Sequence, residues 1–428
     1  MNRSLFKNRS YKALITAQAI SNLGDWFNIL GLMALVGLKW HGSPLAVSIV
    51  MLMFSLPSIL FGSLAGTLAD RMDRKRLMII SDLIRSVLIV GIVFTSSLFE
   101  IYVLVALMSL FSSLFSPAKQ GKLKEIVSNE DIQSAVATSQ LINNAAKIIG
   151  PIIGGILLAA VSINWAFYLD AISFLLSAVL LLFLPKTPVR TVETTQSKET
   201  QKKARFFHQL FDGFTYLKTA PSLLVGLFVF SLVLFVLQIS DSQFIILFRE
   251  IKTSSINILG WVMAGSGLGV VLSSLYLNKK EIRSFISVLS LASAVLGLGY
   301  IFLSTFIHFP VLWIEIVYPL AGVIVGFCFG LALIPFEVMV QKMTPESHTG
   351  RVFGTIDSLT TLAAILGTTL GGVLSQLFGV HFTYDLAGGL LVVVGLVVYI
   401  RRKTLERGNI TDAESQSGAL QEAKSGHS

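Results

Sequence analysis

Twelve apolar stretches, each long enough to cross a lipid bilayer, recur along the whole chain. A membrane span needs about 20 mostly apolar residues. Backbone groups in lipid must satisfy their own hydrogen bonds, so we expect each stretch to be a helix. The approximate bounds are 13–38, 44–69, 77–98, 101–117, 134–160, 164–184, 222–248, 256–277, 284–306, 310–335, 352–378 and 382–400.

The composition agrees with a polytopic membrane protein. Only 13% of the 428 residues are charged, whereas a soluble domain carries about 25%. The net charge of +9 does not indicate a nucleic-acid-binding protein, because the cations occur in short blocks between apolar stretches. The single cysteine, Cys328, excludes an internal disulfide and a cysteine-based metal cluster.

The placement of Lys and Arg predicts the orientation of the chain. With a cytoplasmic amino terminus, the inner segments hold 28 Lys and Arg residues and the outer segments hold 3. This asymmetry favours both termini in the cytoplasm and an even number of helices. The first apolar stretch is long enough to span, so we expect it to be retained and not cleaved as a signal peptide. A bacterial inner (plasma) membrane is the expected location.

The composition divides the chain into four parts. We expect six-helix bundles over residues 1–184 and 222–402, with a polar cytoplasmic linker at 185–221 between them. Apolar residues at helical spacing in 206–217 predict either an interfacial amphipathic helix or an extension of the next span. Residues 403–428 are polar and are predicted to be a disordered cytoplasmic tail.

An internal repeat supports two like-built halves. A Gly-x-x-x-Gly-Gly pattern begins at Gly150 and again at Gly367, an offset of 217 residues. Upstream, Pro117 and Pro335 are 218 residues apart, and we expect each proline to end a helix.

The most distinctive stretch is a dense cluster of charged residues between the second and third spans. Gly62 and Gly66 form a small-xxx-small pair that predicts close approach of another helix. Charged residues follow within ten positions: Asp70, Arg71, Asp73, Arg74, Lys75 and Arg76. A positive-inside loop would require only the cations, so their ordered spacing is more specific than charge alone.

This spacing resembles motif A of the major facilitator superfamily. Asp73 stands where the superfamily usually has glycine, which resembles the drug:proton antiporter branch with macrolide efflux proteins and enterobactin exporters. The resemblance implies an all-α fold of twelve transmembrane helices in two pseudo-symmetric six-helix bundles, with substrate bound near the midplane between them. It also implies that motif A latches the cytoplasmic side against the start of the eleventh span, at Gly350, Arg351 and Asp357.

A second resemblance concerns the direction of transport. Gly150, Pro151, Gly154 and Gly155 resemble motif C, which in this superfamily is associated with exporters. Glycines let a helix pack tightly against a helix of the other half, and the proline permits a bend. Ordinary small-residue packing is the alternative explanation.

The first span contains the leading candidate for proton coupling. Asp25 lies near its middle, where an ionised carboxylate is costly unless it faces a cavity, a partner or a proton. The flanking Asn22, Trp26 and Asn28 offer hydrogen bonds and apolar surface to a ligand. A purely structural polar cluster is the alternative.

Other intramembrane charges are further candidates. Lys147 is predicted to pair with Asp25, or to bind an anionic substrate group. Asp241 and Glu315 belong to cavity-lining helices in the superfamily fold, although a solvated position is an equal alternative. Three charges are predicted to be structural: the i,i+3 pair Asp82 and Arg85, and Asp170.

These features predict a secondary transporter and not an enzyme. We expect a monomeric, proton-coupled exporter of amphipathic or hydrophobic small molecules, with no cofactor and no metal. No nucleotide-binding Gly-rich loop is present in the sequence. The fourth span lacks the arginine of a full motif B, so Asp25 would have to carry the proton. A lipid or lysophospholipid translocator, an importer, and a non-transporting sensor or enzyme remain alternatives.

The latch predicts the behaviour of an Asp70→Asn variant. Removing the charge should slow the inward-to-outward cycle without changing substrate choice, because a carboxylate is stabilised at a helix amino terminus. Turnover measured for two or more substrates checks both parts. Wild-type turnover in the variant would count against the latch.

Overall fold

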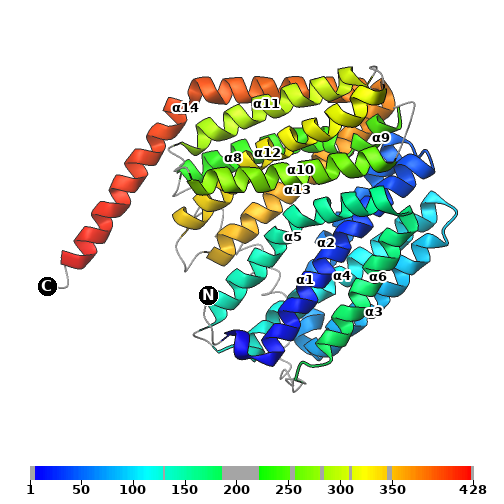
Figure 1. Ribbon diagram of the computed structural model, residues 1–428. Helices are drawn as coiled ribbons and strands as arrows, with labels where there is room; N and C mark the ends of the chain where they lie inside the picture. Colours follow the sequence, from blue (N-terminus) through cyan, green and yellow to red (C-terminus); the bar gives the residue numbers. More distant parts are fainter. Residues whose placement is uncertain are drawn as a thin grey trace. The chain divides into compact units, whose positions relative to one another are not determined.

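The computed structural model describes residues 5–128, 131–185, 221–250, 256–279, 284–307, 311–344 and 349–425, and every regular element in them is helical (Figure 1). The first half contains η1 (Leu5–Lys7), α1 (Arg9–Met33), η2 (Ala34–Lys39), α2 (Pro44–Arg71), α3 (Arg74–Val93), α4 (Leu98–Ile126), α5 (Ile132–Ala160) and α6 (Ile163–Leu181). The second half contains α8 (Pro221–Asp241), α9 (Phe244–Arg249), α10 (Ile256–Lys279), α11 (Phe285–Phe306), α12 (Val311–Met343), α13 (Thr349–Phe378) and α14 (Val380–Ser425).

Each predicted apolar stretch coincides with a helix or with two consecutive helices. The pairs α1 with η2 and α8 with α9 each account for one stretch. Within the described residues, eleven helices are long and apolar enough to cross a membrane. The exception among the predicted spans is α3, which begins with three cations and also carries Asp82 and Arg85. The prediction of an all-α, multi-pass membrane protein is confirmed.

Capping side chains define where several helices begin. Ser43 Oγ accepts a hydrogen bond from the Ala46 amide (3.1 Å), and Pro44 follows at a position that needs no amide hydrogen. Ser284 Oγ accepts from the Ser287 amide (3.0 Å) at the start of α11. These caps satisfy first-turn amides that have no partner within the helix.

The prediction that prolines end two helices is wrong. α4 continues past Pro117 to Ile126, and α12 continues past Pro335 to Met343. A proline removes one backbone hydrogen bond but leaves the following turns intact. Ala118 and Leu123, after the first proline, are buried, so tertiary packing keeps that end of α4 helical.

The carboxyl-terminal segment also differs from the prediction. α14 runs to Ser425, through most of the 403–428 tail that the sequence predicts to be disordered. Good helix formers such as Leu, Glu, Ala and Gln recur there, and no proline interrupts them. The linker prediction falls almost entirely outside the described residues, and so does its amphipathic segment at 206–217; Pro221 begins α8.

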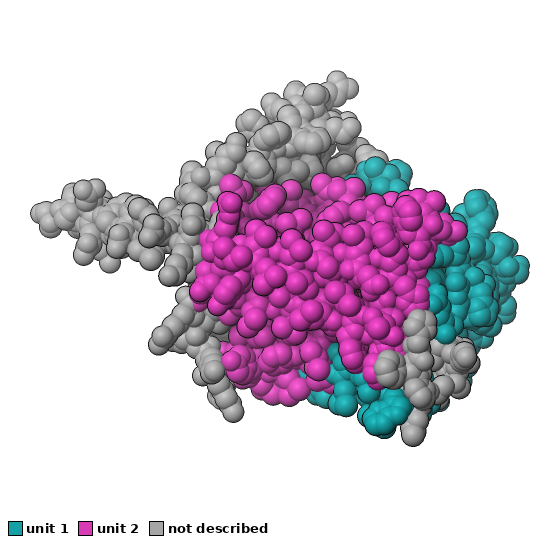
Figure 2. All heavy atoms as spheres, turned by 90° about the horizontal axis from the view of Figure 1, so that it is seen from above, with its two compact units in different colours: residues 1–195, 242–268, 309–322 teal, residues 196–241, 269–308, 323–428 magenta. Residues whose placement is uncertain are grey.

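The chain forms two compact units, which Figure 2 colours separately. Unit 1 comprises residues 1–195, 242–268 and 309–322, and unit 2 comprises residues 196–241, 269–308 and 323–428. Unit 1 therefore contains α1 to α6 together with α9 and one end of each of α10 and α12.

The same helix pairings occur inside each unit. In unit 1, α1 packs on α5 and α6, and α3 packs on α6. In unit 2, α8 packs on α13 and α14, and α11 packs on α14. The first, third, fifth and sixth long helices of each half thus contact one another in the same way, as a duplicated chain requires.

Glycines of the repeated pattern form the α1–α5 contact in unit 1. A Cβ atom added to Gly150 would overlap the Trp26 ring, and one added to Gly154 would lie 2.6 Å from Leu30 Cδ1. Real side chains do not approach so closely, so glycine is required for this helix separation.

The second copy of the pattern has the same role in unit 2. A Cβ atom added to Gly367 of α13 would overlap the Phe235 carbonyl oxygen of α8, and one added to Gly371 would overlap that of Ile239. The repeated glycines therefore face equivalent helices, α1 and α8, in the two units.

Gly155 faces a different neighbour. A Cβ atom on it would overlap the carbonyl oxygen of Gly260 on α10, and the reverse substitution would overlap the Gly155 oxygen. Both residues belong to unit 1. This backbone contact is the tight packing of the fifth span on a helix of the second half that the sequence predicts.

Gly62 does not have the predicted role. No described atom lies within 4 Å of a Cβ atom added there. The adjacent Leu60 and Phe61 are 61% and 43% exposed, so this part of α2 presents an open face. The prediction of close helix approach at Gly62 is wrong for the residues that the structure describes.

The Gly155 contact predicts opposite effects of two alanine substitutions. Gly155→Ala should lower stability by about 1–3 kcal/mol, because the added methyl group overlaps the α10 backbone. Gly389→Ala on α14 is the matched control, since a Cβ atom there meets nothing within 4 Å. It should be neutral or stabilising by up to about 1 kcal/mol. Thermal unfolding in detergent measures both; equal shifts would contradict the contact.

Candidate functional site

The acidic residue that departs from the superfamily pattern caps a helix. Asp73 Oδ1 accepts a hydrogen bond from the Lys75 amide (2.9 Å) at the start of α3, and Asp73 Oδ2 lies 3.8 Å from Arg76 Nε. A carboxylate is favourable at a helix amino terminus. The aspartate therefore stabilises the turn between α2 and α3.

The basic residues of the same stretch connect three helices of unit 1. Arg74 Nη1 pairs with Glu125 Oε1 of α4 (2.5 Å), and the buried Lys122 donates to Glu125 Oε2 (3.0 Å). Lys75 Nζ donates to the carbonyl oxygens of Leu182 and Leu184 after α6 (2.6 Å each). This network, which we call the base network, joins the start of α3 to the ends of α4 and α6.

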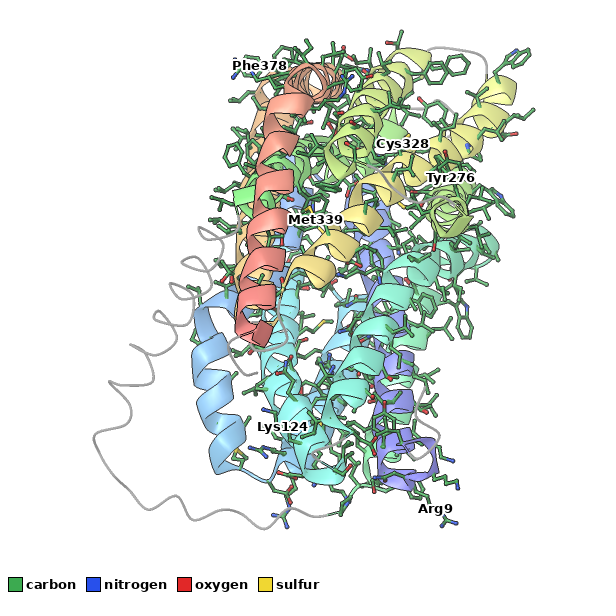
Figure 3. All side chains as sticks on the ribbon, turned by 90° about the vertical axis from the view of Figure 1, so that its left-hand side faces the viewer. Arg9, Lys124, Tyr276, Cys328, Met339 and Phe378 are labelled. Atoms are coloured by element: carbon green, nitrogen blue, oxygen red, sulfur yellow. The ribbon has the colours of Figure 1, made fainter. Side chains whose placement is uncertain are left out.

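Figure 3 shows Arg9 and Lys124 toward the same end of unit 1, as expected of cations on one membrane side. The side chains of the other latch residues lie outside the part of the chain that the structure describes. α2 ends at Arg71 and α13 begins at Thr349. The proposed contact between these regions stays a prediction. The side chains not described there are those of Gly66, Asp70, Arg71, Gly350, Arg351 and Asp357.

Asp25 is half-buried on α1 and lies within electrostatic range of Arg85 and Asp82. Among the described residues, its carboxylate has no hydrogen-bond or ion-pair partner, so it is available to a proton or a ligand group. The predicted pair with Lys147 is not present in the described part of the chain. Lys147 is exposed, whereas Ala146 and Gly150 on the same helix are buried, with Gly150 against α1. Lys147 lies on the same face of α5 as Asn143 and Gly150, which contact α1, but its side chain is exposed and forms no described ion pair.

The polar and aromatic neighbours of Asp25 have separate roles. Asn22 Nδ2 donates to Asn143 Oδ1 on α5 (2.8 Å), so its amide group ties two helices together. Trp26 is half-buried against Gly150. Asn28 is 1% exposed, and neither atom of its amide group has a partner among the described residues.

The two second-tier carboxylates are exposed. Asp241 is the last residue of α8 in unit 2, and Glu315 lies in the first turns of α12 in unit 1. Exposure alone does not distinguish a solvated position from one that lines a cavity, so both alternatives stay open.

The sequence prediction underestimated a buried polar cluster between α3 and α6. Arg85 forms an ion pair with Asp82, whose Oδ2 accepts a hydrogen bond from Ser177 Oγ (2.6 Å). The Arg85 guanidinium also lies over the rings of Phe174 (4.0 Å) and Phe115 (5.1 Å). The predicted i,i+3 pair is therefore present, and the structure adds that both charged side chains are buried.

Asp170 belongs to the same region. It is fully buried on α6, its Oδ1 lies 3.2 Å from Ser173 Oγ, and its Oδ2 has no described partner. A Cβ atom on Gly24 of α1 would overlap Asp170 Oδ1, so α1 closes directly over this carboxyl group. The sequence feature that indicates this region is one aspartate in each of three spans of the same half, namely Asp25, Asp82 and Asp170.

Comparison with known proteins shows the same family along the whole chain. A model described as Major Facilitator Superfamily matches residues 15–368 and 317–425. The chain is 42% identical over 423 residues to YfiS of Bacillus subtilis (strain 168), described as an uncharacterized MFS-type transporter. That alignment covers 98% of this chain and 100% of the relative.

More distant relatives include two named exporters. Macrolide efflux protein A of Streptococcus pyogenes is 24% identical over 83% of this chain and 87% of its own length. Enterobactin exporter EntS of Salmonella typhimurium is 26% identical over 82% and 83%. A solved mutant of the peptide transporter POT, in complex with alafosfalin, has the same fold, with a TM-score of 0.67 at 14% identity over 94% of this chain and 96% of that one.

The buried ion pair predicts non-additive effects on stability. Asp82→Asn should cost about 3–5 kcal/mol, because it leaves the Arg85 charge buried without its partner. The double variant Asp82→Asn with Arg85→Gln should recover most of this loss. Unfolding in detergent measures the cycle, with Asp385→Asn at an exposed position of α14 as the control. Additive losses would show that the two charges act independently.

Proposed function

The chain belongs to the Major Facilitator Superfamily, and from this premise we propose that it exports amphipathic or hydrophobic small molecules in exchange for protons. Its family and fold are those of transporters. The proposed transporter is a monomer in the plasma membrane, with both termini in the cytoplasm and no cofactor beyond the proton gradient.

The observation that carries the proposal is the environment of the Asp25 carboxylate. Its carboxylate lies in a membrane-spanning helix, is half-buried, and has no described ion-pair partner. An intramembrane carboxylate of this kind is a candidate proton or ligand site. A proton that binds and leaves there provides a means of coupling transport to the gradient.

Two features support export. The tight α5–α10 contact at Gly155 and Gly260 occurs in the glycine motif associated with exporters. Two relatives are named for efflux of a macrolide and export of enterobactin. An apolar or amphipathic substrate of moderate size is therefore the best-supported class.

Because the 101–117 stretch contains no arginine, Asp25 would have to carry the coupling proton in the proposed transporter. In the proposed cycle, protonation of Asp25 neutralises the site on one side of the membrane, and release on the other side restores the charge. By the resemblance to motif A, Asp70 and its basic neighbours would latch the cytoplasmic side against the start of the eleventh span in the outward-open state.

The first experiment uses an Asp25→Asn variant. It should abolish uphill efflux, because the amide cannot release a proton, while folding and some ligand binding remain. Dye efflux from energised cells, or dye uptake into inverted vesicles, measures transport, and Asp385→Asn is the control for loss of an exposed carboxylate. Unchanged uphill efflux in Asp25→Asn would reject this residue as the coupling site.

A second experiment addresses substrate and direction. Overproduction in an efflux-deficient host, tested against a growth-inhibition panel, should protect against amphipathic compounds. Accumulation of a protective compound in inverted vesicles should follow the proton gradient. Net uptake in right-side-out vesicles would indicate an importer, and movement of labelled lipid without drug transport would indicate a lipid translocator.

A further inference from the structure

The buried polar region of unit 1 contains an excess of negative charge. Asp25 of α1, Asp82 and Arg85 of α3, and Asp170 of α6 lie within electrostatic range of one another. If all were ionised, three carboxylates would face one guanidinium group. An uncompensated carboxylate in a low-dielectric interior is unfavourable, so the excess must be neutralised.

The cation described in this region, Arg85, already has a partner. Arg85 is paired with Asp82, and Ser177 donates a further hydrogen bond to the same carboxylate. The guanidinium group also lies over the rings of Phe115 and Phe174, and these contacts help to hold it in place. The pair is neutral as a unit, so Asp25 and Asp170 are left without a compensating charge among the described residues.

Asp170 has the surroundings of a neutral carboxylic acid. Its side chain is fully buried, and its single described hydrogen-bonding side chain is the Ser173 hydroxyl. Its Oδ2 atom has no described partner. An ionised carboxylate in a protein interior normally accepts several hydrogen bonds or pairs with a cation, and Asp170 does neither.

Asn28 supplies a second, independent observation. Gly24, Asn28 and Gly31 form one stripe of α1, since residues four and three apart share a helix face. Gly24 packs against Asp170 and Gly31 packs against Phe167, both on α6. Asn28 therefore faces α6 between these contacts, and both atoms of its buried amide group are unpartnered. The α1 face that contacts Asp170 thus carries a neutral donor and acceptor and no described cation, although the two side chains form no described hydrogen bond.

Other helices packed on α6 supply no additional neutralising charge among the described residues. α1 contributes Asp25, and α3 contributes Asp82 and Arg85. α5 carries Lys147, but this side chain is exposed and forms no described ion pair.

We propose that Asp170 is a second proton-binding site, which holds a proton in the core of unit 1 beside the proton on Asp25. Asp25, the half-buried member, is the group through which protons enter from water and return to it. Any role of this second proton in transport rests on the proposed function. The binding of the proton to Asp170 is independent of that function.

The test is infrared spectroscopy of the purified full chain at neutral pH, where ordinary aspartates are ionised. The carbonyl stretch of protonated carboxyl groups is measured in water and in deuterium oxide. Wild type should show the signal of two buried acids. Asp170→Asn and Asp25→Asn should each remove about half of it, the double variant nearly all, and the exposed control Asp385→Asn none. An unchanged signal in Asp170→Asn would overturn the proposal.

Two further measurements keep the test decisive. If Asp170→Asn does not fold, as judged by circular dichroism, then Asp25→Asn must still retain one acid signal, and its complete loss would refute the second site. Spectra in sodium chloride and in choline chloride should be identical. A signal that disappears only with sodium would assign the site to that ion and would overturn the assignment to a proton.

Transport is measured separately on the same variants. Two acid signals without dye efflux would remove the proposed function and leave the second proton site intact. Efflux that depends on Asp25, with a single acid signal in wild type, would retain the function and eliminate the second site.

Discussion

Lipid offers no partner to a charge or to a free backbone group, and this constraint organises the whole molecule. The described backbone is helical wherever it is long enough to span, and three of the buried charges, Asp82, Arg85 and Asp170, lie in one region of unit 1. Asp82 and Arg85 neutralise each other there. The remaining carboxylates, Asp25 and Asp170, face the same low-dielectric interior without a cation, which makes protons the simplest means of neutralising them.

Close helix packing determines where these carboxylates lie. Gly150 gives the Trp26 ring room on α5, and Gly24 brings α1 directly over Asp170 on α6. The absence of side chains at these glycines fixes the separation and rotation of α1 relative to its neighbours. The same arrangement recurs in unit 2, where α13 packs on α8 through the second copy of the pattern. The repeated glycines therefore give the same helix contact in both units.

The charges near the water-exposed end of unit 1 have a different task. Asp73 caps α3, and Arg74 pairs with Glu125 at a half-exposed position where desolvation is small. The base network joins three helices, and Glu125 pairs with both Arg74 and the buried Lys122. The acidic replacement for the usual glycine of the motif thus has a local structural explanation, independent of any role in transport.

The sequence by itself determined the all-helical multi-pass fold, the family and the positions of the repeated glycines, because each of these is a local pattern of hydropathy or spacing. It did not determine which side chains meet. Lys147 forms no described ion pair with Asp25, and a Cβ atom on Gly62 would meet no described neighbour. α4 also continues through Pro117. Helix rotation and the choice of neighbouring helix depend on side-chain packing summed over whole surfaces, and a linear pattern does not contain that information. Only the tertiary structure therefore decided that one arginine serves a region with three carboxylates.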